Sequence, residues 1–345
     1  MLFSQEILKW YQENKRELPW RGTKDPYKIW LSEILLQQTR VAQGLPYYHK
    51  FIDAFPTVQS LAKAPEQQVL KLWQGLGYYS RARNLHATAK MVAHDYNGQF
   101  PKTYKALKRL KGVGDYTASA IASICFGVPE PVVDGNVYRV LSRYFGVEMP
   151  INSGKGMDYF KELAREVMAL EDIADYNQGI MEFGAVQCTP KSPDCANCPL
   201  ANGCKALKDD KVNLLPIKQG KTKIRIRYFN YLVYLDERDN TLLEQRTGNG
   251  IWQNLYQFPL LESEGKIELA EIQDATNNSD KLPSWYTAYL YNEEPIVHKL
   301  SHQHLYTSFW ILRTNGKLDN ATAWNKIDIF PVPVLIADFI QRFKI

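Results

Sequence analysis

The spacing of apolar residues divides the chain into two parts, one with the period of helices and one with the alternation of strands. Over about the first 205 residues, apolar positions recur every three or four residues, as on one face of a helix. Glycine and proline residues separate successive segments of this kind. The pattern predicts helices at around 4–15, 26–37, 41–54, 66–74, 79–95, 117–126, 134–145, 156–169 and 175–186.

Beyond residue 210 the pattern changes twice. The stretch KVNLLPIKQGKTKIRIR, residues 211–227, holds six Lys or Arg residues and no acidic residue, which is typical of a linker or a solvated face. IRIRYFNYLVYL and HLYTSFWILR then alternate and are rich in aromatic and β-branched residues, which predicts strands, with a last helix at about 333–343. We therefore expect a multidomain fold: an all-α region at 1–210, a basic interdomain linker at 211–227 and an α+β domain at 228–345.

The composition is that of an ordinary globular protein. The chain has 345 residues, enough for two domains with a core each, and its apolar fraction of 45% and charged fraction of 23% are unremarkable. No apolar run has the length of a membrane span, and the first ten residues lack the basic start and apolar core of a signal peptide. We expect a protein of the cytoplasm, or of a nucleoid within it, that is not secreted.

The stretch LKGVGDYTA, residues 110–118, places Gly112 and Gly114 before a predicted helix. Such glycines can hold a dinucleotide, and Asp134 stands twenty residues beyond Gly114, where a ribose-binding acid would stand. However, the preceding TYKALKRL is a short amphipathic helix rather than a strand, the third glycine is missing, and no Lys-Ser/Thr pair follows to make a Walker loop. A helix, a tight turn and a second helix remain, with five basic and no acidic residues at 101–111, and this favours a polymeric phosphate.

Four of the five cysteines fall within seventeen residues, in CTPKSPDCANCPLANGC. Disulfides are not expected in a chain without a signal peptide, so four thiols this close together indicate a metal centre. Four thiolates can hold either zinc or a [4Fe–4S] cluster, and one compact loop favours the bulkier cluster over the two separated knuckles usual for zinc. The ligands in this C-x6-C-x2-C-x5-C spacing are Cys188, Cys195, Cys198 and Cys204.

These features together resemble the endonuclease-III superfamily of base-excision DNA glycosylases: the hairpin LKGVGDYTA, the aspartate of VVDGNV and the cysteine spacing, in this order. The segments LPWR (18–21), LSEILLQQTRV (31–41) and GLGYYSRARNL (75–85) narrow the resemblance to the adenine DNA glycosylases of the MutY type, over nearly the whole chain. The resemblance implies a monomer that acts on double-stranded DNA with an adenine:8-oxoguanine or adenine:guanine mispair. The sequence says nothing about contacts with a sliding clamp or mismatch-repair proteins.

The resemblance also implies an architecture. A helix-hairpin-helix glycosylase fold is expected, with a six-helix barrel at about 26–134 and an iron–sulfur helical part formed by 1–25 and 135–210. DNA and a flipped adenine would lie between them, and one [4Fe–4S] cluster would be held by the four cysteines. The hairpin 110–116 would bind a DNA phosphate, together with an alkali or alkaline-earth ion. Its phosphate-binding residues would be Lys111, Gly112 and Gly114.

Breaking an N-glycosidic bond needs a proton for the departing base and negative charge near the sugar carbon. Glu33 lies in an apolar helix and Asp134 near a helix start, where they would otherwise be a partly exposed helix acid and an N-cap. The resemblance makes Glu33 the acid that protonates adenine N7 and later helps to activate water, Asp134 the carboxylate that stabilises the cationic sugar, and Asn136 a residue that holds the reacting groups. Tyr116 stands where bifunctional relatives carry a Schiff-base lysine, so we expect a monofunctional enzyme without strong lyase activity.

Further contacts follow from the resemblance alone. Trp20, Arg21 and Gln178 match positions around the adenine, although some relatives have glutamate where Gln178 stands. By the same resemblance, Gln38 would be the wedge beside the orphan base and Tyr78 would intercalate next to that base, while Thr39 and Leu76 would line it.

The C-terminal domain resembles the Nudix fold, and GIWQNLYQFP fits that family. No REx2EExG-like acidic helix occurs after residue 228, so we do not expect nucleotide hydrolysis. KLSHQHL is similar to the Phe-Ser-His loop that probes 8-oxoguanine, with Leu300 in place of phenylalanine and Ser301 and His302 retained.

Two alternatives stay open. A thymine or uracil mismatch glycosylase of the same superfamily shares the hairpin and the cluster but typically lacks the second domain. A non-catalytic helix-hairpin-helix protein that only binds lesions would not need both Glu33 and Asp134.

Overall fold

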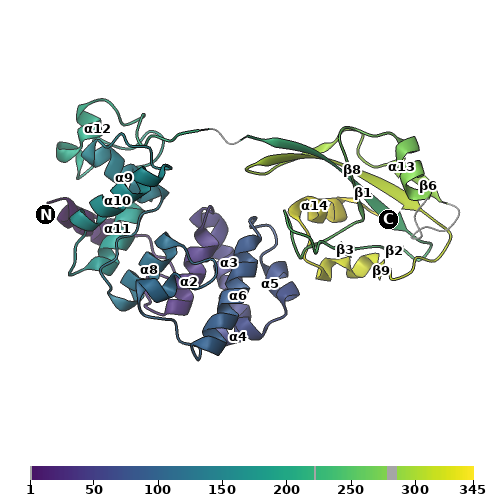
Figure 1. Ribbon diagram of the computed structural model, residues 1–345, viewed down its shortest axis with the longest axis horizontal. Helices are drawn as coiled ribbons and strands as arrows, with labels where there is room; N and C mark the ends of the chain where they lie inside the picture. The colour runs from purple at the N-terminus through teal and green to yellow at the C-terminus, as the bar shows by residue number, and fades with distance from the viewer. Residues whose placement is uncertain (1, 221–222, 278–285) are drawn as a thin grey trace. The chain divides into compact units, whose positions relative to one another are not determined.

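A computed structural model describes residues 2–220, 223–277 and 286–345, so that residues 221 and 222 of the predicted linker lie outside the described part (Figure 1). The chain forms two compact units. The first, here called the helical unit, comprises Met1–Ala64 and Arg83–Gly220. The second, the C-terminal unit, comprises Lys221–Ile345 together with the inserted segment Pro65–Ala82.

The predicted all-α region is confirmed, and its long helices begin and end within a few residues of the expected positions. Helices too short to show a period, α4 and α12, were not predicted. None of the helices in the described ranges has the length and hydropathy needed to cross a bilayer. The elements up to residue 208 are α1 (Leu2–Asn14), α2 (Pro26–Leu36), α3 (Val41–Ala54), α4 (Val58–Lys63), α5 (Glu66–Leu72), α6 (Ser80–Asp95), α7 (Tyr104–Leu107), α8 (Asp115–Phe126), α9 (Gly135–Phe145), α10 (Gly154–Val167), α11 (Ile173–Val186), η1 (Ala201–Gly203) and α12 (Lys205–Lys208).

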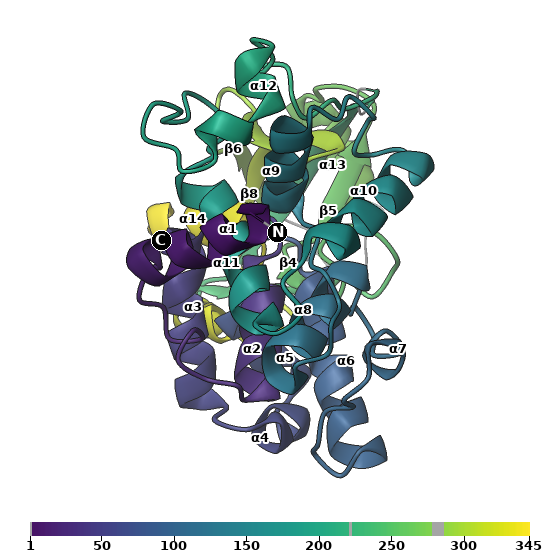
Figure 2. The same ribbon diagram turned by 90° about the vertical axis from the view of Figure 1, so that its left-hand side faces the viewer.

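Helices α2 and α8 form the centre of the helical unit because they are apolar on all sides. The Asp25 carboxylate caps α2 by accepting the Tyr27 N–H, and Pro26 occupies its first turn, which suits a residue without an N–H. Both helices are buried along most of their length and pack against each other, and α8 also contacts α11 (Figure 2). Helix α11 packs in turn on α1 and α9. Side chains from distant parts of the sequence therefore meet around α2 and α8.

The C-terminal unit is built on a mixed sheet in the order β5-β1-β8-β6, with β7 also pairing with β8. Strands β1 and β8, both predicted, run parallel to each other, and the shorter strands β5, β6 and β7 are antiparallel to them. The elements are β1 (Arg225–Leu235), β2 (Asn240–Thr241), β3 (Glu244–Gln245), β4 (Tyr256–Gln257), β5 (Leu260–Ser263), α13 (Leu269–Asn277), β6 (Thr287–Leu290), β7 (Ile296–Lys299), β8 (Gln303–Arg313), β9 (Thr322–Ala323), η2 (Trp324–Ile329) and α14 (Val334–Arg342).

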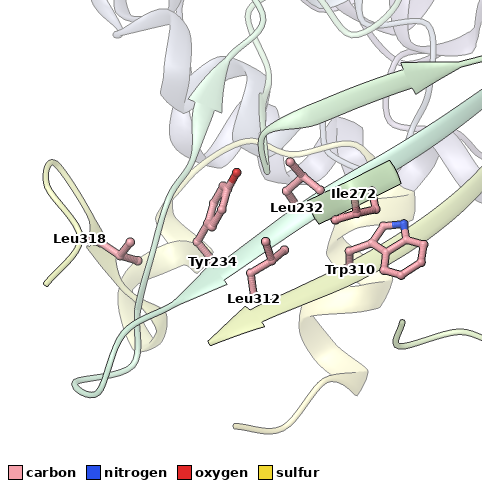
Figure 3. Packing of buried hydrophobic residues seen from close by; sticks show 6 residues of the cluster. All are labelled: Leu232, Tyr234, Ile272, Trp310, Leu312 and Leu318. Atoms are coloured by element: carbon pink, nitrogen blue, oxygen red, sulfur yellow. The ribbon is translucent and has the colours of Figure 1, made fainter. Parts of the chain in front are cut away.

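Alternation along β1 and β8 sends side chains into two apolar layers. On one face, the two strands contribute four residues to a cluster that Ile272 of α13 covers; its members are Leu232, Tyr234, Ile272, Trp310, Leu312 and Leu318 (Figure 3). On the other face, the ring of Phe309 on β8 stacks on the ring of Phe339 on α14, with the centroids 4.0 Å apart. The sheet is thus covered on both faces, as an α+β unit requires.

The inserted segment Pro65–Ala82 lies inside the region expected to form the six-helix barrel, yet it packs with the C-terminal residues. Helix α5 is fixed at its start, where the Asn254 side-chain amide donates to the Glu66 carboxylate over 2.6 Å. It is fixed at its end, where the Lys71 ammonium donates to the Phe330 carbonyl over 3.2 Å. Proximity in sequence therefore does not decide which unit this segment joins.

Candidate active site

Glu33 lies in the middle of α2 and is buried. Burial raises the pKa of its carboxyl group to about 7 because desolvation disfavours the charged form, and the nearby charge of Asp134 acts in the same direction. A hydrogen bond with Tyr116 and the positive charge of Arg21 oppose this rise. A carboxyl group with this pKa still carries a proton near neutral pH and can donate it, which is the requirement for a general acid.

Tyr116 reaches Glu33 from the first turn of α8. Burial and the charges of Glu33 and Asp134 raise the pKa of the phenol well above its ordinary value, so the hydroxyl stays protonated. The same hydroxyl lies 3.1 Å from the Met181 Sδ atom on α11. Tyr116, at the position expected to hold a lysine in a bifunctional enzyme, is therefore a neutral hydrogen-bond donor.

Asp134 is the N-cap of α9, the structural role expected for an aspartate at the start of a helix. Its carboxylate accepts the backbone N–H groups of Asn136 over 2.9 Å and Val137 over 2.8 Å, and also the Asn136 side-chain amide over 2.9 Å. Burial raises the pKa of Asp134, while these hydrogen bonds and the charge of Arg139 oppose the rise. Arg139 was not predicted; its guanidinium donates to the Asn136 side-chain oxygen over 2.9 Å and to the Cys188 carbonyl over 2.7 Å.

The three residues predicted to surround adenine differ in their environments. Trp20 is buried against Tyr48 in an edge-to-face contact, and Gln178 is buried on α11. Arg21 donates from Nη2 to the Glu182 carboxylate over 2.6 Å and from Nη1 to the Tyr11 hydroxyl over 3.3 Å. Its positive charge is thereby held in place, close enough to Glu33 to oppose the rise in the pKa of that carboxyl group.

Glu182, which sequence reasoning missed, is almost fully buried on α11. The Arg16 guanidinium donates to both of its carboxylate oxygens, over 2.6 and 2.7 Å. Burial alone would raise the pKa of Glu182, but the hydrogen bond from Arg16 and the charges of the two arginines lower it. The signal was present, because Glu182 is an acid in an apolar helix, as Glu33 is. A cavity of about 470 Å³ adjoins Arg16 and Arg21, and neither Glu33 nor Asp134 lines it.

The end of α2 presents Gln38 to solvent with a φ of +57°, a left-handed conformation that is uncommon for a residue with a side chain. Its neighbour Gln37 donates to the Thr117 hydroxyl over 3.2 Å and so ties the end of α2 to the start of α8. Thr39 is half-buried, and its N–H donates to the Leu36 carbonyl. Backbone strain of this kind persists only where the surroundings hold it, and it is common in residues that contact a ligand.

The loop Gly75–Tyr79, here called the wedge loop, has three residues with left-handed φ angles: Gly75, Gly77 and Tyr78. The Trp73 indole N–H donates to the Gly77 carbonyl over 2.9 Å, and the Arg81 guanidinium stacks on both Trp73 and Tyr78. Tyr78 is half exposed at the surface of the C-terminal unit. Leu76, another residue of this loop that was predicted to contact DNA, is buried.

The hairpin between α7 and α8 contains two glycines, and its geometry requires glycine at the first, Gly112. Gly112 has a φ of +76°, and a Cβ atom there would lie 2.7 Å from Asn84 Cβ. Gly114 is the N-cap of α8 and makes no side-chain cap, so the first N–H groups of the helix face outward with the positive end of its dipole. The Lys111 side chain is exposed next to them. The carboxylate of Asp115 in this turn is balanced by Lys161 at 3.1 Å and Lys108 at 3.5 Å.

The four predicted cysteine ligands are free thiols that line one small cavity after α11, together with Arg143. Arg143 donates to the Cys188 sulfur over 3.4 Å and to the Thr189 carbonyl over 2.8 Å. In the described ranges, no group of three or more His, Cys, Asp or Glu side chains is placed to hold a metal ion. Four cysteine thiols are suitable ligands for a thiolate-bound centre, but their sulfur atoms are not placed close enough together to hold a single metal ion.

The turn between β7 and β8 carries the predicted lesion-sensing residues. The Leu300 N–H donates to the Gln303 carbonyl over 2.8 Å, which closes the turn. Ser301 and His302 are exposed, and the serine hydroxyl lies 3.3 Å from the His302 Nδ1 atom. The Arg225 N–H donates to the His302 carbonyl, so the turn is attached to β1.

Comparison with known proteins gives a match in each part of the chain. Residues 31–166 match the HhH-GPD superfamily of base excision DNA repair proteins, and residues 230–342 match the NUDIX domain. An adenine DNA glycosylase of Buchnera aphidicola subsp. Baizongia pistaciae is 34% identical over 352 residues, which span 100% of this chain and 97% of that protein. The human adenine DNA glycosylase is 42% identical over 213 residues, which span 59% of this chain and 39% of that protein.

Solved structures agree with the fold of the helical region. A thermostable thymine-DNA glycosylase matches with a TM-score of 0.56 and 33% identity, over 60% of this chain and 96% of that chain. Endonuclease III, trapped as a covalent intermediate with DNA, matches with a TM-score of 0.53 and 24% identity, over 60% and 94% of the two chains, and so shares the fold.

Proposed function

We propose that this chain, which belongs to the adenine DNA glycosylases of the HhH-GPD superfamily, removes adenine that is paired with 8-oxoguanine in duplex DNA. Like its relatives, it is a DNA repair glycosylase that acts on DNA and releases adenine. The choice of 8-oxoguanine as the opposite base is our proposal. The observation that carries the proposed chemistry is Glu33, a buried carboxyl group with a pKa of about 7 in contact with a neutral tyrosine.

In the proposed reaction Glu33 donates its proton to N7 of the flipped adenine, which makes the base a better leaving group. General acid catalysis of this kind contributes about 10² to 10⁴ in rate. After the base has left, the resulting carboxylate accepts a proton from the attacking water. The Tyr116 hydroxyl supports both states because a neutral phenol can hydrogen-bond with the acid and with its anion.

Asp134 supplies the negative charge near the sugar. Its hydrogen bonds with the start of α9 stabilise the anion and oppose the rise in pKa that desolvation causes, whereas Glu33 has no such backbone donors. Burial raises the pKa of both carboxyl groups, and the donors from α9, which Glu33 lacks, are the basis for assigning the anion to Asp134 and the proton to Glu33. Asn136 fixes the aspartate and is itself held by Arg139.

Absence of an amine at Tyr116 supports a monofunctional enzyme that leaves an abasic site intact. A purified protein that nicks the product strand efficiently without heat or alkali would show this part of the proposal to be wrong.

The C-terminal unit is proposed to read the lesion through the exposed Ser301 hydroxyl and His302. In the described residues of this unit, α13 carries only Glu271 and Asp274 as acids, which argues against hydrolysis of nucleotides.

The cysteine loop is proposed to hold one [4Fe–4S] cluster. Four thiols lining one cavity, with an arginine N–H directed at the Cys188 sulfur, fit such a centre. Cys188, Cys195, Cys198 and Cys204 would be its ligands, and the cluster would fix the fold of the loop. The proposal fails if freshly purified protein contains stoichiometric zinc and lacks the visible absorbance of an iron–sulfur centre.

DNA is proposed to bind through the hairpin amides around Lys111, Gly112 and Gly114, with an alkali or alkaline-earth ion on main-chain oxygens of residues 110–116. Gln38 and Tyr78 are proposed as the wedges, because both are exposed and held in left-handed conformations. We further propose that the protein acts as a monomer on the nucleoid.

Single-turnover base release tests the proposal, with duplexes that carry adenine or thymine opposite 8-oxoguanine or guanine. We expect adenine release to be fastest opposite 8-oxoguanine and to be lost in Glu33→Gln. Release of thymine in preference to adenine would support the thymine-specific alternative. Binding without release of either base would support a lesion-binding protein.

A further inference from the structure

We propose that the tripeptide Phe330–Val332, here called the brace, positions the wedge loop so that Tyr78 can enter DNA. This inference rests on the proposed function, in which Tyr78 is a wedge. It gives the C-terminal region a second role, in base flipping, beside the reading of the lesion.

Three hydrogen bonds connect the brace to the two ends of the wedge loop. Before the loop, Lys71 donates to the Phe330 carbonyl over 3.2 Å, and the Gln74 side-chain oxygen accepts the Val332 N–H over 3.3 Å. At the end of the loop, the Tyr79 hydroxyl donates to the Val332 carbonyl over 3.3 Å. Tyr79 and Val332 are both buried, so the hydrogen bond between them is shielded from water, while the other two are partly buried.

The wedge loop has a backbone that needs such support. Tyr78 follows Gly77, and both have left-handed φ angles, which a tyrosine adopts only where the surroundings hold it. Trp73 and Arg81 hold the loop from within through the Gly77 carbonyl. The brace holds the loop from outside by fixing its two ends on one short segment. Together these contacts leave the Tyr78 ring as the exposed side chain of the loop, while Leu76 and Tyr79 are buried.

The brace is itself a rigid part of the C-terminal unit. The Tyr256 N–H on β4 donates to the Pro331 carbonyl over 2.8 Å, and the Tyr256 and Phe330 rings lie 4.7 Å apart. Pro331 and Pro333 restrict the backbone on either side of Val332. The Asn254 contact with Glu66 fixes the far end of α5 in the same unit. A displacement of the C-terminal unit would therefore move the wedge loop with it.

The test is a base-flipping measurement on the full chain, in a Glu33→Gln background that prevents excision. A duplex with 2-aminopurine in place of the target adenine and 8-oxoguanine opposite reports flipping, because the fluorescence of the probe rises when it leaves the stack. The test variant is Tyr79→Phe with Gln74→Met, which removes two contacts to Val332 and keeps the volumes. The matched control is Tyr286→Phe, which removes one hydroxyl hydrogen bond elsewhere in the same unit.

We expect the test variant and Tyr78→Ala each to slow the fluorescence rise about tenfold, and the control to leave it unchanged. Lys71→Met, which removes the Phe330 contact and the hydrogen bond from Lys71 to the Gln74 side chain but leaves both contacts to Val332, should slow it less. In the active background, the test variant should keep the pH dependence of the wild type. An unchanged rise in the test variant, or an equal loss in the control, would overturn the proposal, and so would a Tyr78→Ala variant that flips normally.

Failure of the proposed function and failure of the brace give different results. If the wild type flips the probe but releases no adenine, the proposed function is wrong and the brace is not. If the test variant melts at a much lower temperature than the control and Lys71→Met has no effect on flipping, the contacts serve stability alone and the brace is refuted.

Discussion

The groups proposed for chemistry and those proposed for lesion reading sit in opposite environments. Glu33, Tyr116 and Asp134 are enclosed by α2, α8 and α9, and burial shifts the pKa of each. Ser301 and His302 are exposed on a turn, bonded mainly to their immediate neighbours. A buried charged or polar group changes its energy strongly when one partner is lost, whereas an exposed group exchanges that partner for water. We therefore expect large effects on rate in the first region and small effects on discrimination in the second.

The largest expected effect is that of Glu33→Gln. Glutamine keeps the shape of the side chain but has no acidic proton, so adenine release should fall by about 10³ or more. Single-turnover kinetics near pH 7 with saturating enzyme measure it. A loss below tenfold would mean that the buried acid is not the proton donor. The expected contrast in effect size between the buried groups and the exposed turn would then not hold.

Asp134 allows its charge and its cap to be separated. Asp134→Asn removes the negative charge but keeps a good N-cap, and Asp134→Ala removes both. We expect both variants to lose about 10² in rate, while only the alanine variant loses about 1 kcal/mol of stability. Base release and thermal unfolding of the pair measure these two effects. Equal stability in both variants would show that the cap contributes nothing.

Because the pKa of Glu33 is raised, both the activity and the stability of the protein should depend on pH, and the direction of each dependence is fixed. The folded protein holds this proton up to a pH of about 7, whereas the unfolded chain releases it at the ordinary value of 4.5, so this group's contribution to stability falls as the pH rises between them. Activity should fall as the pH rises above about 7. Glu33→Gln should be more stable than the wild type at pH 8, by up to about 3 kcal/mol, and nearly equal to it at pH 5. Denaturant unfolding at both pH values decides this; the opposite order of stabilities would contradict the burial of a carboxyl group whose partners only partly offset its desolvation.

A smaller effect is expected from Ser301→Ala. The loss of one exposed hydrogen bond should reduce the preference for 8-oxoguanine over guanine by about three- to tenfold. The maximal rate and its pH dependence should not change. Competition between the two duplexes measures the preference, and a change in the pH profile would show that the turn affects the catalytic groups.

The smallest expected effect is a gain. Leu300→Phe introduces an aromatic ring next to Ser301 and should strengthen binding to the lesion duplex about threefold through stacking on a base. Equilibrium binding in the Glu33→Gln background measures it. Weaker binding would indicate that the turn, closed by the Leu300 N–H, has no room for the ring.

The long elements were predictable because their own residues determine them. Helices α2 and α8 and strands β1 and β8 have apolar patterns long enough to show a period. Helix α4, with six residues, is shorter than two helical turns and shows no period. The association of Pro65–Ala82 with the C-terminal residues depends on contacts such as that of Lys71 with Phe330, which no local pattern contains.

The candidate site was predictable to the same extent. Glu33 stood out because an acid in an apolar helix is costly to bury. Glu182 gave the same signal on α11, but its partners Arg16 and Arg21 lie more than 150 residues earlier in the chain. The contact of Tyr116 with Glu33 exists only because α8 packs on α2. Residue types were thus visible in the sequence, whereas their pairing required the fold.

The grouping of residues 65–82 with residues 223–345 bears on how members of this family can be recombined. A crossover in the basic linker 211–227 looks natural along the sequence, but it would combine α5 from one parent with its packing partners from another. In such a chimera, Gln74 and Tyr79 would face a Phe330–Val332 segment that did not evolve with them. A hybrid that exchanges residues 65–82 together with the C-terminal region keeps these partners matched.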